Sequence, residues 1–295
     1  MVNKTTNPAP TIVTSSNHTP ERYLGHSASG RIAYHPRVAE VEFKIEDRVA
    51  RITINRPERR NAMSFDVMRM LLEAVDRVAE DESVNAAVLT GAGDRAFSAG
   101  ADLIDMGTNS SAIEAHKARG LLADVFRSLW RLDKPTIARV RGFALAGGFG
   151  LAMACDFVIA SEDAQFGTPE IDVGLWPYMI TVPLLRSMPQ RFALELMATG
   201  RRVAADEAAR VGFVNRVVPV DELDASVDDL ARNLASKSPL ILGWGKRSFY
   251  RTLQMDTDAA LDYLQNMLTL TTLSRDSAEG IAAFAEKRKP EWHGQ

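Results

Sequence analysis

Short apolar runs alternate with helix-like stretches along most of this chain, and this alternation limits the folds that it can adopt. Residues 41–54 alternate apolar and polar side chains around a turn and predict a β-hairpin. Ser64 can cap a helix in which residues 67–78 carry apolar side chains at helical spacing. Residues 86–90 form a short apolar run typical of a buried strand. Strands that alternate with helices predict an α/β fold.

The same alternation continues to about residue 220, and helical periodicity follows. Leu122, Val125, Phe126 and Leu129 mark the apolar face of one further helix. Strands are predicted at 135–140, 157–160 and 213–218, a small-residue turn at 142–150, and helices at 181–199, 204–211 and from 221 onward. The sequence therefore predicts a core over 39–220 and a C-terminal helical region over 221–295.

Residues 1–38 differ in composition from the rest of the chain. They are rich in Ser, Thr, Pro and Asn and poor in large apolar side chains, so they can bury little surface. We predict a disordered polar arm. The arm has more basic than acidic residues, which also fits an organelle transit peptide, although no apolar helical stripe accompanies the arginines.

Charge and composition exclude several classes of function. Lys and Arg number 35 and Asp and Glu number 38, so the net charge of -3 is unsuited to holding a polyanion, and no nucleic-acid partner is expected. No uninterrupted apolar run reaches the roughly 18–20 residues that a membrane span needs, so no membrane partner is expected either. We expect a cytoplasmic protein, with which the use of a single cysteine is consistent.

Cysteine and histidine are too few in the core to predict a metal site. Cys155 is the one cysteine, which excludes an internal disulfide, and its apolar neighbours predict a buried side chain. Three of the five histidines lie in residues 1–38 and His293 lies near the C-terminus. His116 remains, and we expect it on a solvated helix face.

Residues 91–96, GAGDRA, match the dinucleotide-binding pattern G-x-G-x-x-A. A dinucleotide site of that kind needs a helix to start at the glycines. The FSAGA that follows is a poor helix start, so we interpret 91–96 as a turn and expect no nucleotide cofactor.

Three segments carry residues suited to catalysis: 97–103 (FSAGADL), 142–150 (GFALAGGFG) and 166–171 (FGTPEI). Small residues in the first two let the backbone approach a ligand, and each precedes a candidate helix start with free N–H groups. One N–H from each loop could hold a carbonyl oxygen as an oxyanion hole, with Glu170 as acid or base. Taken singly, each loop is better explained as a structural turn and Glu170 as a surface carboxylate. The order and spacing of all three favour a site.

These segments resemble those of the crotonase superfamily, also called the enoyl-CoA hydratase/isomerase family. The resemblance covers about residues 41–292. It is carried by NRPERRNAMS at 55–64, FSAGADL at 97–103, KPTIARVRGFALAGGFGLAMACD at 134–156, AQFGTPEIDVGLWP at 164–177, LMATGRRVAADEAARVGFVNRVVP at 196–219 and EGIAAFAEKRKPEW at 279–292. It implies an α/β spiral of ββα repeats with a C-terminal helical region that drives trimerisation, and trimers that often pair into hexamers.

The resemblance also implies a coenzyme A thioester as substrate, with no metal or redox cofactor. It places the backbone N–H groups of Ala101 and Gly147 in the oxyanion hole and makes Glu170 a catalytic glutamate. Further substrate- and CoA-binding candidates are Ala62, Ala99, Asp102, Leu103, Ile104, Gly148 and Trp176, and the candidate phosphate contacts are Arg59, Arg60, Arg95 and Lys287. A solvated surface charge is the alternative for each of these basic residues.

The chain departs from the family pattern at two places. Gly150 stands where a classical hydratase has its second catalytic glutamate, and the bulky LWPYMI at 175–180 replaces a glycine-rich stretch. Trp176 and Tyr178 then either face the acyl pocket or pack under the active-site loop.

We predict an enoyl-CoA hydratase-like enzyme that adds water to a 2-enoyl-CoA, with Glu170 as acid/base at a raised pKa. An enoyl-CoA isomerase that uses the same glutamate is the close alternative, because moving a double bond needs one base. Hydrolase chemistry and a non-catalytic acyl-CoA-binding scaffold stay open.

Overall fold

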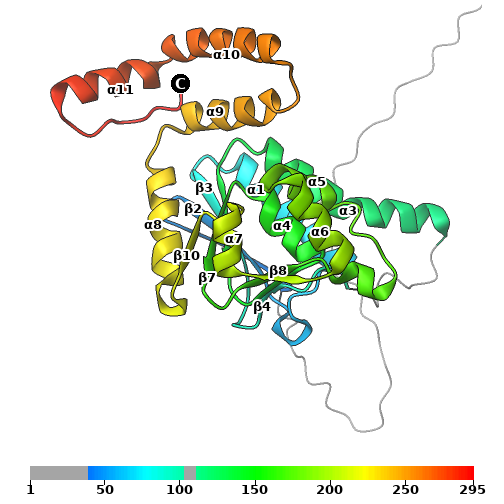
Figure 1. Ribbon diagram of the computed structural model, residues 1–295. Helices are drawn as coiled ribbons and strands as arrows, with labels where there is room; N and C mark the ends of the chain where they lie inside the picture. The colour runs from blue at the N-terminus through cyan, green and yellow to red at the C-terminus, as the bar shows by residue number, and fades with distance from the viewer. Residues whose placement is uncertain (1–38, 103–110) are drawn as a thin grey trace, which may run out of the picture. The chain divides into compact units, whose positions relative to one another are not determined.

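The computed structural model describes residues 39–102 and 111–295 (Figure 1). The predicted arm at 1–38, and Leu103 and Ile104 among the candidate binding residues, lie outside the described residues. Val38–Gln295 forms one compact unit. The division of this unit into a core that ends at residue 220 and a C-terminal helical region that starts at 221 stays a prediction.

Two sheets form the frame of the molecule. The larger sheet has the order β1 (Val41–Glu46), β2 (Val49–Ile54), β3 (Ala86–Gly91), β5 (Thr136–Val140), β7 (Phe157–Ser161) and β10 (Arg216–Val218). The smaller has the order β4 (Ala96–Ser98), β6 (Phe143–Leu145), β8 (Gln165–Gly167) and β9 (Arg202–Ala204). The β1–β2 hairpin and the β8–β9 pair are antiparallel, and the other pairs are parallel.

The chain adds one strand to each sheet in turn and then forms a helix. β3 and β4 precede α3 (Ala112–Arg131), β5 and β6 precede α4 (Gly147–Ala154), and β7 and β8 precede η2 (Pro169–Val173) and α5 (Thr181–Ser187). This winding confirms the predicted α/β spiral of ββα repeats.

The central strands β3, β5 and β7 of the large sheet are buried on both faces, which explains their nearly continuous apolar residues. Val88, Ile137 and Ile159 face α8 (Leu223–Ala235), which packs against β2, β3, β5 and β7 (Figure 1). Alternate residues of the same strands, Leu89 and Val158 among them, join the main core on the other face. That core includes the inward faces of α1 (Phe65–Glu80), α3 and α4. The structure buries all four residues of the apolar face predicted in α3.

The remaining helices complete the fold. They are the short η1 (Pro57–Arg59) and η3 (Val220–Glu222), α6 (Gln190–Thr199), α7 (Ala205–Val211), α9 (Pro239–Thr252), α10 (Thr257–Thr272) and α11 (Arg275–Glu286). Ser64 caps α1 as predicted, since its hydroxyl accepts a hydrogen bond of 3.1 Å from the Val67 N–H. In the described part of the chain, no helix combines the length and the apolar character needed to cross a membrane.

Three local predictions were wrong. The expected turn over 142–150 contains strand β6, and α4 already begins at Gly147 because three small residues there tolerate close packing. The predicted helix over 181–199 is two helices, because Pro189 cannot continue the hydrogen-bond pattern of the first. The strand predicted at 213–218 begins at Arg216, since Phe213 and Val214 instead enter the core.

Candidate active site

Two backbone amides meet where the first two small-residue loops approach each other. Gly147 is the first residue of α4, so its N–H has no partner within the helix. A Cβ built on Gly147 would lie 3.6 Å from the Ala101 nitrogen, and one built on Gly100 would lie 3.1 Å from the Gly147 nitrogen. Within residues 39–102 and 111–295, neither the Ala101 N–H nor the Gly147 N–H has a hydrogen-bond acceptor. The pair is free to bind a carbonyl oxygen of a ligand.

Backbone strain at Ala146 orients the N–H of Gly147. Ala146 lies at φ 51° and ψ -129°, a conformation that a residue with a Cβ rarely adopts. Its N–H donates to the Gly167 carbonyl at 2.9 Å, which ties α4 to the end of β8. Gly100 lies at φ +99°, and a Cβ there would lie 2.7 Å from the Ala146 Cβ. Only glycine fits at position 100.

A buried polar network holds the first amide in place. Asn61 is fully buried at φ 54°, and its side chain donates to the carbonyls of Ala92 (2.9 Å) and Ala96 (2.7 Å). The Ser98 hydroxyl donates to the Asn61 carbonyl at 2.8 Å and accepts from the Gly100 N–H at 3.2 Å. Ala101 follows directly and pairs with Met63 in an isolated parallel bridge. The network fixes the loop that carries the Ala101 amide.

Sequence reasoning missed Asn61 and Ser98 as supporting residues. An asparagine between a turn and a buried segment is a usable signal, since asparagine tolerates positive φ better than most residues. Nothing in the sequence marks the Ser98 hydroxyl.

Glu170 follows strand β8, which pairs with β6, the strand that leads to Gly147. β6 and β8 pair in parallel with Leu145 opposite Gly167, so the chain segments that leave these two strands start side by side. Pro169 opens η2, and Glu170 comes next, in its first turn. One carboxylate oxygen, Oε2, is buried and has no hydrogen-bond partner in the described part of the protein. Burial raises the pKa of Glu170 to about 7. A partly buried carboxyl group with such a pKa is suited to exchanging protons at neutral pH.

The space beside Gly150 is occupied. A Cβ built on Gly150 would lie 2.4 Å from the Ile180 Cγ2, 2.7 Å from the Ile180 Cβ and 3.0 Å from the Phe126 Cζ. Both side chains are buried at 2% exposure. A glutamate side chain at position 150 would need Ile180 to move. The packing therefore excludes a second carboxylate from this position of α4 and leaves Glu170 as the acid/base candidate. The role of Ile180 was not apparent from the sequence.

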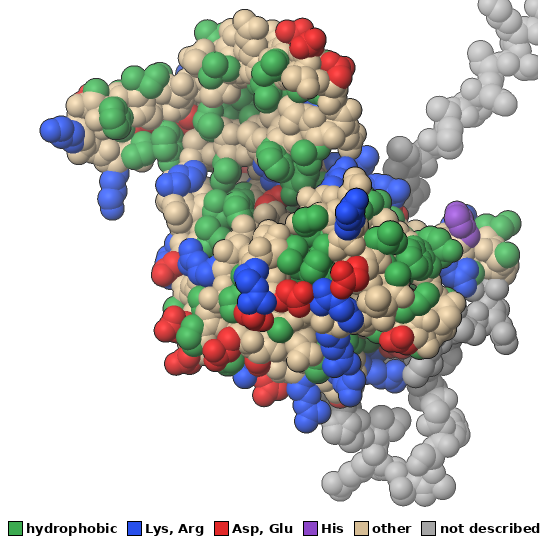
Figure 2. All heavy atoms as spheres, in the orientation of Figure 1, with side chains coloured by type: hydrophobic (Ala, Val, Ile, Leu, Met, Phe, Trp, Pro, Cys, Tyr) green, Lys and Arg blue, Asp and Glu red, His purple; other side chains and the backbone are tan. Residues whose placement is uncertain are grey.

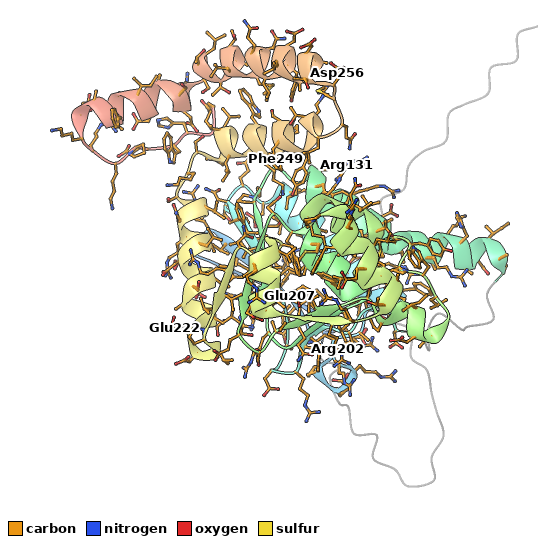
Figure 3. All side chains as sticks on the ribbon, in the orientation of Figure 1. Arg131, Arg202, Glu207, Glu222, Phe249 and Asp256 are labelled. Atoms are coloured by element: carbon orange, nitrogen blue, oxygen red, sulfur yellow. The ribbon has the colours of Figure 1, made fainter. Side chains whose placement is uncertain are left out.

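Three arginines border a cavity of about 400 Å³ on the small sheet. Arg60, Arg95 and Arg202 line it together with Ala99, Phe143 and Leu145. The Arg202 guanidinium, on β9 (Figure 3), lies 5.0 Å from the centroid of the Phe143 ring. Among the described residues, none of the three arginines has a carboxylate partner. The structure thus brings the predicted Arg60 and Arg95 together and adds Arg202, which sequence reasoning missed.

Arg59 and Asp102 are engaged with each other. Asp102 is 6% exposed, and its carboxylate lies 3.2 Å from Arg56 and 3.5 Å from Arg59. The Arg56 guanidinium also donates to the Ala62 carbonyl at 2.8 Å, so this ion-pair group ties the candidate residues Ala62 and Asp102 together. Their contact with a ligand stays a prediction.

The remaining candidates lie in different surroundings. Gly148 is buried, and a Cβ there would lie 2.3 Å from the Ser98 carbonyl oxygen, so its first role is close packing of α4 on β4. Trp176 is half-buried against the main core, whereas Tyr178 is 74% exposed. Lys287 follows the end of α11, a helix that packs against α9 and α10, and within the described residues it makes no ion pair.

Other titratable groups give no metal site in the described residues, where no group of three or more His, Cys, Asp or Glu side chains is placed to hold an ion. Cys155 is buried as predicted, and burial raises the pKa of its thiol to about 12, so it is unreactive. His116 is exposed on α3, as predicted.

Comparison with known proteins agrees with this geometry. The family model described as enoyl-CoA hydratase/isomerase matches residues 44–295. The chain is 40% identical over 245 residues to the crotonyl-CoA hydratase of Syntrophomonas wolfei and 38% identical over 247 residues to the short-chain-enoyl-CoA hydratase of Clostridium acetobutylicum. Each alignment covers 83% of this chain and 94% of the relative.

A solved structure gives the same result. The crystal structure of an enoyl-CoA hydratase from Mycobacterium smegmatis superimposes with a TM-score of 0.83 at 36% identity, and the match covers 87% of this chain and all of that one. The shared fold, the family match along the spiral and the level of identity lead to one conclusion. The chain belongs to the enoyl-CoA hydratase/isomerase family, within the crotonase superfamily.

Proposed function

We propose that this protein adds water to the double bond of a 2-enoyl-CoA thioester, with Glu170 as the acid/base. The observation that carries the proposal is the occurrence of two acceptor-free amides, at Ala101 and Gly147, together with the Glu170 carboxyl group, whose Oε2 is buried and whose pKa is raised to about 7. The relatives named above as hydratases of short-chain enoyl-CoA and crotonyl-CoA support this reaction class.

The reaction uses one carboxyl group first as a base and then as an acid. The Glu170 carboxylate takes a proton from water while the water oxygen bonds to C3 of the enoyl group. The C2–C3 π electrons move toward the thioester, and the Ala101 and Gly147 N–H groups stabilise the resulting enolate oxygen. The Glu170 carboxylic acid then returns the proton to C2, so one water is added and the enzyme is regenerated.

The nucleotide end of coenzyme A needs cationic partners outside this centre. We assign its phosphates to the arginine-lined cavity formed by Arg60, Arg95 and Arg202, whose guanidinium groups have no carboxylate partners in the described part of the chain. Lys287 stays a candidate phosphate contact. Catalysis by this centre requires no metal or redox cofactor, and we propose a cytoplasmic location.

An isomerase is the second candidate, and the packing at Gly150 favours it specifically. Because Ile180 fills the space beside Gly150, Glu170 acts without a second carboxylate from α4 to hold the water. Transfer of one proton from C2 to C4 of a 3-enoyl-CoA through Glu170 needs no water. The retained carboxyl group argues against the third alternative, a scaffold that binds acyl-CoA without turnover.

Product analysis separates these candidates. The protein is incubated with a panel of 2-enoyl- and 3-enoyl-CoAs in ¹⁸O-labelled water, and the products are examined by mass spectrometry. We expect labelled water to be gained from a 2-enoyl-CoA. Unchanged mass with a shifted retention time, from a 3-enoyl-CoA, would identify an isomerase. Glu170→Gln should lower turnover at least about 10²-fold, as loss of a general acid–base does, and exposed Glu162→Gln is the matched control.

We further propose that the protein assembles as a homotrimer or a pair of trimers. The C-terminal helices carry many exposed apolar side chains (Figure 2), among them Leu261 (61% exposed) and Leu268 (64%) on α10 and Ile281 (69%) and Phe284 (87%) on α11. Apolar surface on this scale is typical of an interface. Light scattering during gel filtration measures the mass directly, and a monomer at micromolar concentration would contradict the assembly.

A further inference from the structure

A small cavity adjoins the paired amides. Its volume is about 30 Å³, and its walls are mainly apolar. The lining residues are Met63, Phe65, Met68, Ala101, Asp102, Arg119, Leu122 and Met179. Three of them are methionines from three places in the chain: the residue before the α1 cap, the body of α1, and the segment that follows η2.

The cavity wall reaches both amide positions. Ala101 itself lines the cavity. A Cβ built on Gly147 would lie 3.2 Å from the Leu122 Cδ2 and 3.3 Å from the Met63 Cε, and both of these residues line the cavity. An acyl chain whose carbonyl oxygen is bound between these amides therefore starts at the mouth of this cavity.

The volume limits what can enter. The cavity is small beside the roughly 150 Å³ of an apolar cavity that holds benzene, so as built it admits a short alkyl group and no longer chain. Met63 is 1% and Met68 is 4% exposed, so both are held by the packed core, whereas Met179 is 38% exposed. Methionine is unbranched and adaptable, so a longer chain can enter when a methionine moves, at a cost in packing.

We propose that Met68 and Met179 set the acyl-chain length of the substrate, and that the cavity as built takes the terminal methyl group of a four-carbon 2-enoyl-CoA. This rests on the proposed function, because it assigns the carbonyl oxygen to the two amides. Each further methylene has to displace a methionine side chain.

The test compares kcat/KM for straight-chain 2-enoyl-CoAs of four, six, eight and ten carbons. We expect the wild-type protein to prefer four carbons. Met179→Ala and Met68→Ala should each raise the eight-carbon to four-carbon ratio about 10-fold or more, since one methylene in an apolar pocket is worth 10–200-fold. Met188→Ala is the matched control, because Met188 is buried (7% exposed) but does not line the cavity.

An unchanged ratio in both variants, with normal turnover of the four-carbon substrate, would overturn the proposal. Met179 is the more exposed of the two, so its variant keeps the test informative if Met68→Ala fails to fold. Titration calorimetry with saturated acyl-CoAs of the same lengths measures how binding affinity depends on chain length, without turnover. If no enoyl-CoA is hydrated but Met179→Ala still tightens binding of the longer chains, the proposed function fails and the length assignment stands.

Discussion

Glu170 makes both stability and activity depend on pH. Burial raises its pKa from 4.5 to about 7, so the folded protein holds this proton more tightly than the unfolded chain does. The resulting stabilisation is fully present below pH 4.5 and is lost as the pH rises through 7. A shift of this size corresponds to about 3 kcal/mol.

We expect Glu170→Gln to be more stable than the wild-type protein by up to about 3 kcal/mol at about pH 8, and equally stable at about pH 4. Urea denaturation at both pH values measures the difference. The wild-type kcat/KM should rise through pH 7, because the carboxylate form takes the proton from water. Equal stability at both pH values would show that the carboxyl group is solvated.

Gly150 offers a prediction whose sign depends on one neighbour. In an exposed helix, Gly→Ala stabilises by roughly 1 kcal/mol. Here the new Cβ would meet Ile180 at 2.4 Å, and overpacking of that kind typically costs 1–3 kcal/mol. We therefore expect Gly150→Ala to destabilise the wild-type protein.

In an Ile180→Ala background, the same Gly150→Ala change should instead stabilise, because the clash is removed and the helix preference remains. Thermal unfolding of the four proteins in this cycle measures the reversal. If Gly150→Ala has the same sign in both backgrounds, Ile180 does not fill the space beside α4.

At the scale of elements, the loop between β4 and Ala101 depends on one hydroxyl. Ser98→Ala removes the bridge between the Asn61 carbonyl and the Gly100 N–H. We expect kcat to fall about 10-fold or more with a smaller change in KM, because a displaced oxyanion-hole donor weakens transition-state binding. Steady-state kinetics with one enoyl-CoA measures both constants.

Ser161→Ala is the matched control for that change. Ser161 is also fully buried and its hydroxyl donates to the Asp163 carboxylate, with the Val140 carbonyl 3.3 Å away, but it lies on β7 in the large sheet. An equal loss of kcat in both variants would mean that Ser98 acts through general stability.

For the whole molecule, one buried ion pair joins α9 to the spiral. Lys246 on α9 lies 2.7 Å from the Asp156 carboxylate, and the two side chains are 6% and 11% exposed. Lys246 also donates to the carbonyls of Leu129 (3.0 Å) and Lys134 (2.9 Å), and the Tyr250 hydroxyl donates to Asp156 at 2.8 Å. This buried polar group is one attachment of the C-terminal helices to the core, and the Arg247–Asp133 ion pair at the surface is another.

Lys246→Met should cost about 3–5 kcal/mol, because it leaves the Asp156 charge buried with one fewer cationic partner. Chemical denaturation followed by fluorescence measures the loss. The surface pair of Arg210 and Asp206 is the comparison, since its side chains are 71% and 67% exposed, and Arg210→Met should cost less than about 1 kcal/mol. Similar losses in the two variants would contradict a joining role for Lys246.

Local patterns predicted much of this fold. The hairpin, α1 with its Ser64 cap, the apolar face of α3 and the alternation of strands and helices follow from residue spacing, because each depends on neighbours within a few positions. The break at Pro189 and the early start of α4 at Gly147 were missed. The first is a local signal that the apolar periodicity masked, and the second depends on packing against Ser98.

The sequence by itself determined the alternation of strands and helices, the two small-residue loops and the presence of Glu170, since these depend on residue type and order along the chain. The ββα repeats and the roles of the Ala101 and Gly147 amides came from its resemblance to a known family. Only the tertiary structure decided the rest. It brought the two amides together, buried Glu170 enough to raise its pKa to about 7, filled the space beside Gly150 with Ile180, and added Arg202 to the arginine-lined cavity. The physical reason is that desolvation and steric fit arise between residues far apart in the chain, and no local pattern encodes either.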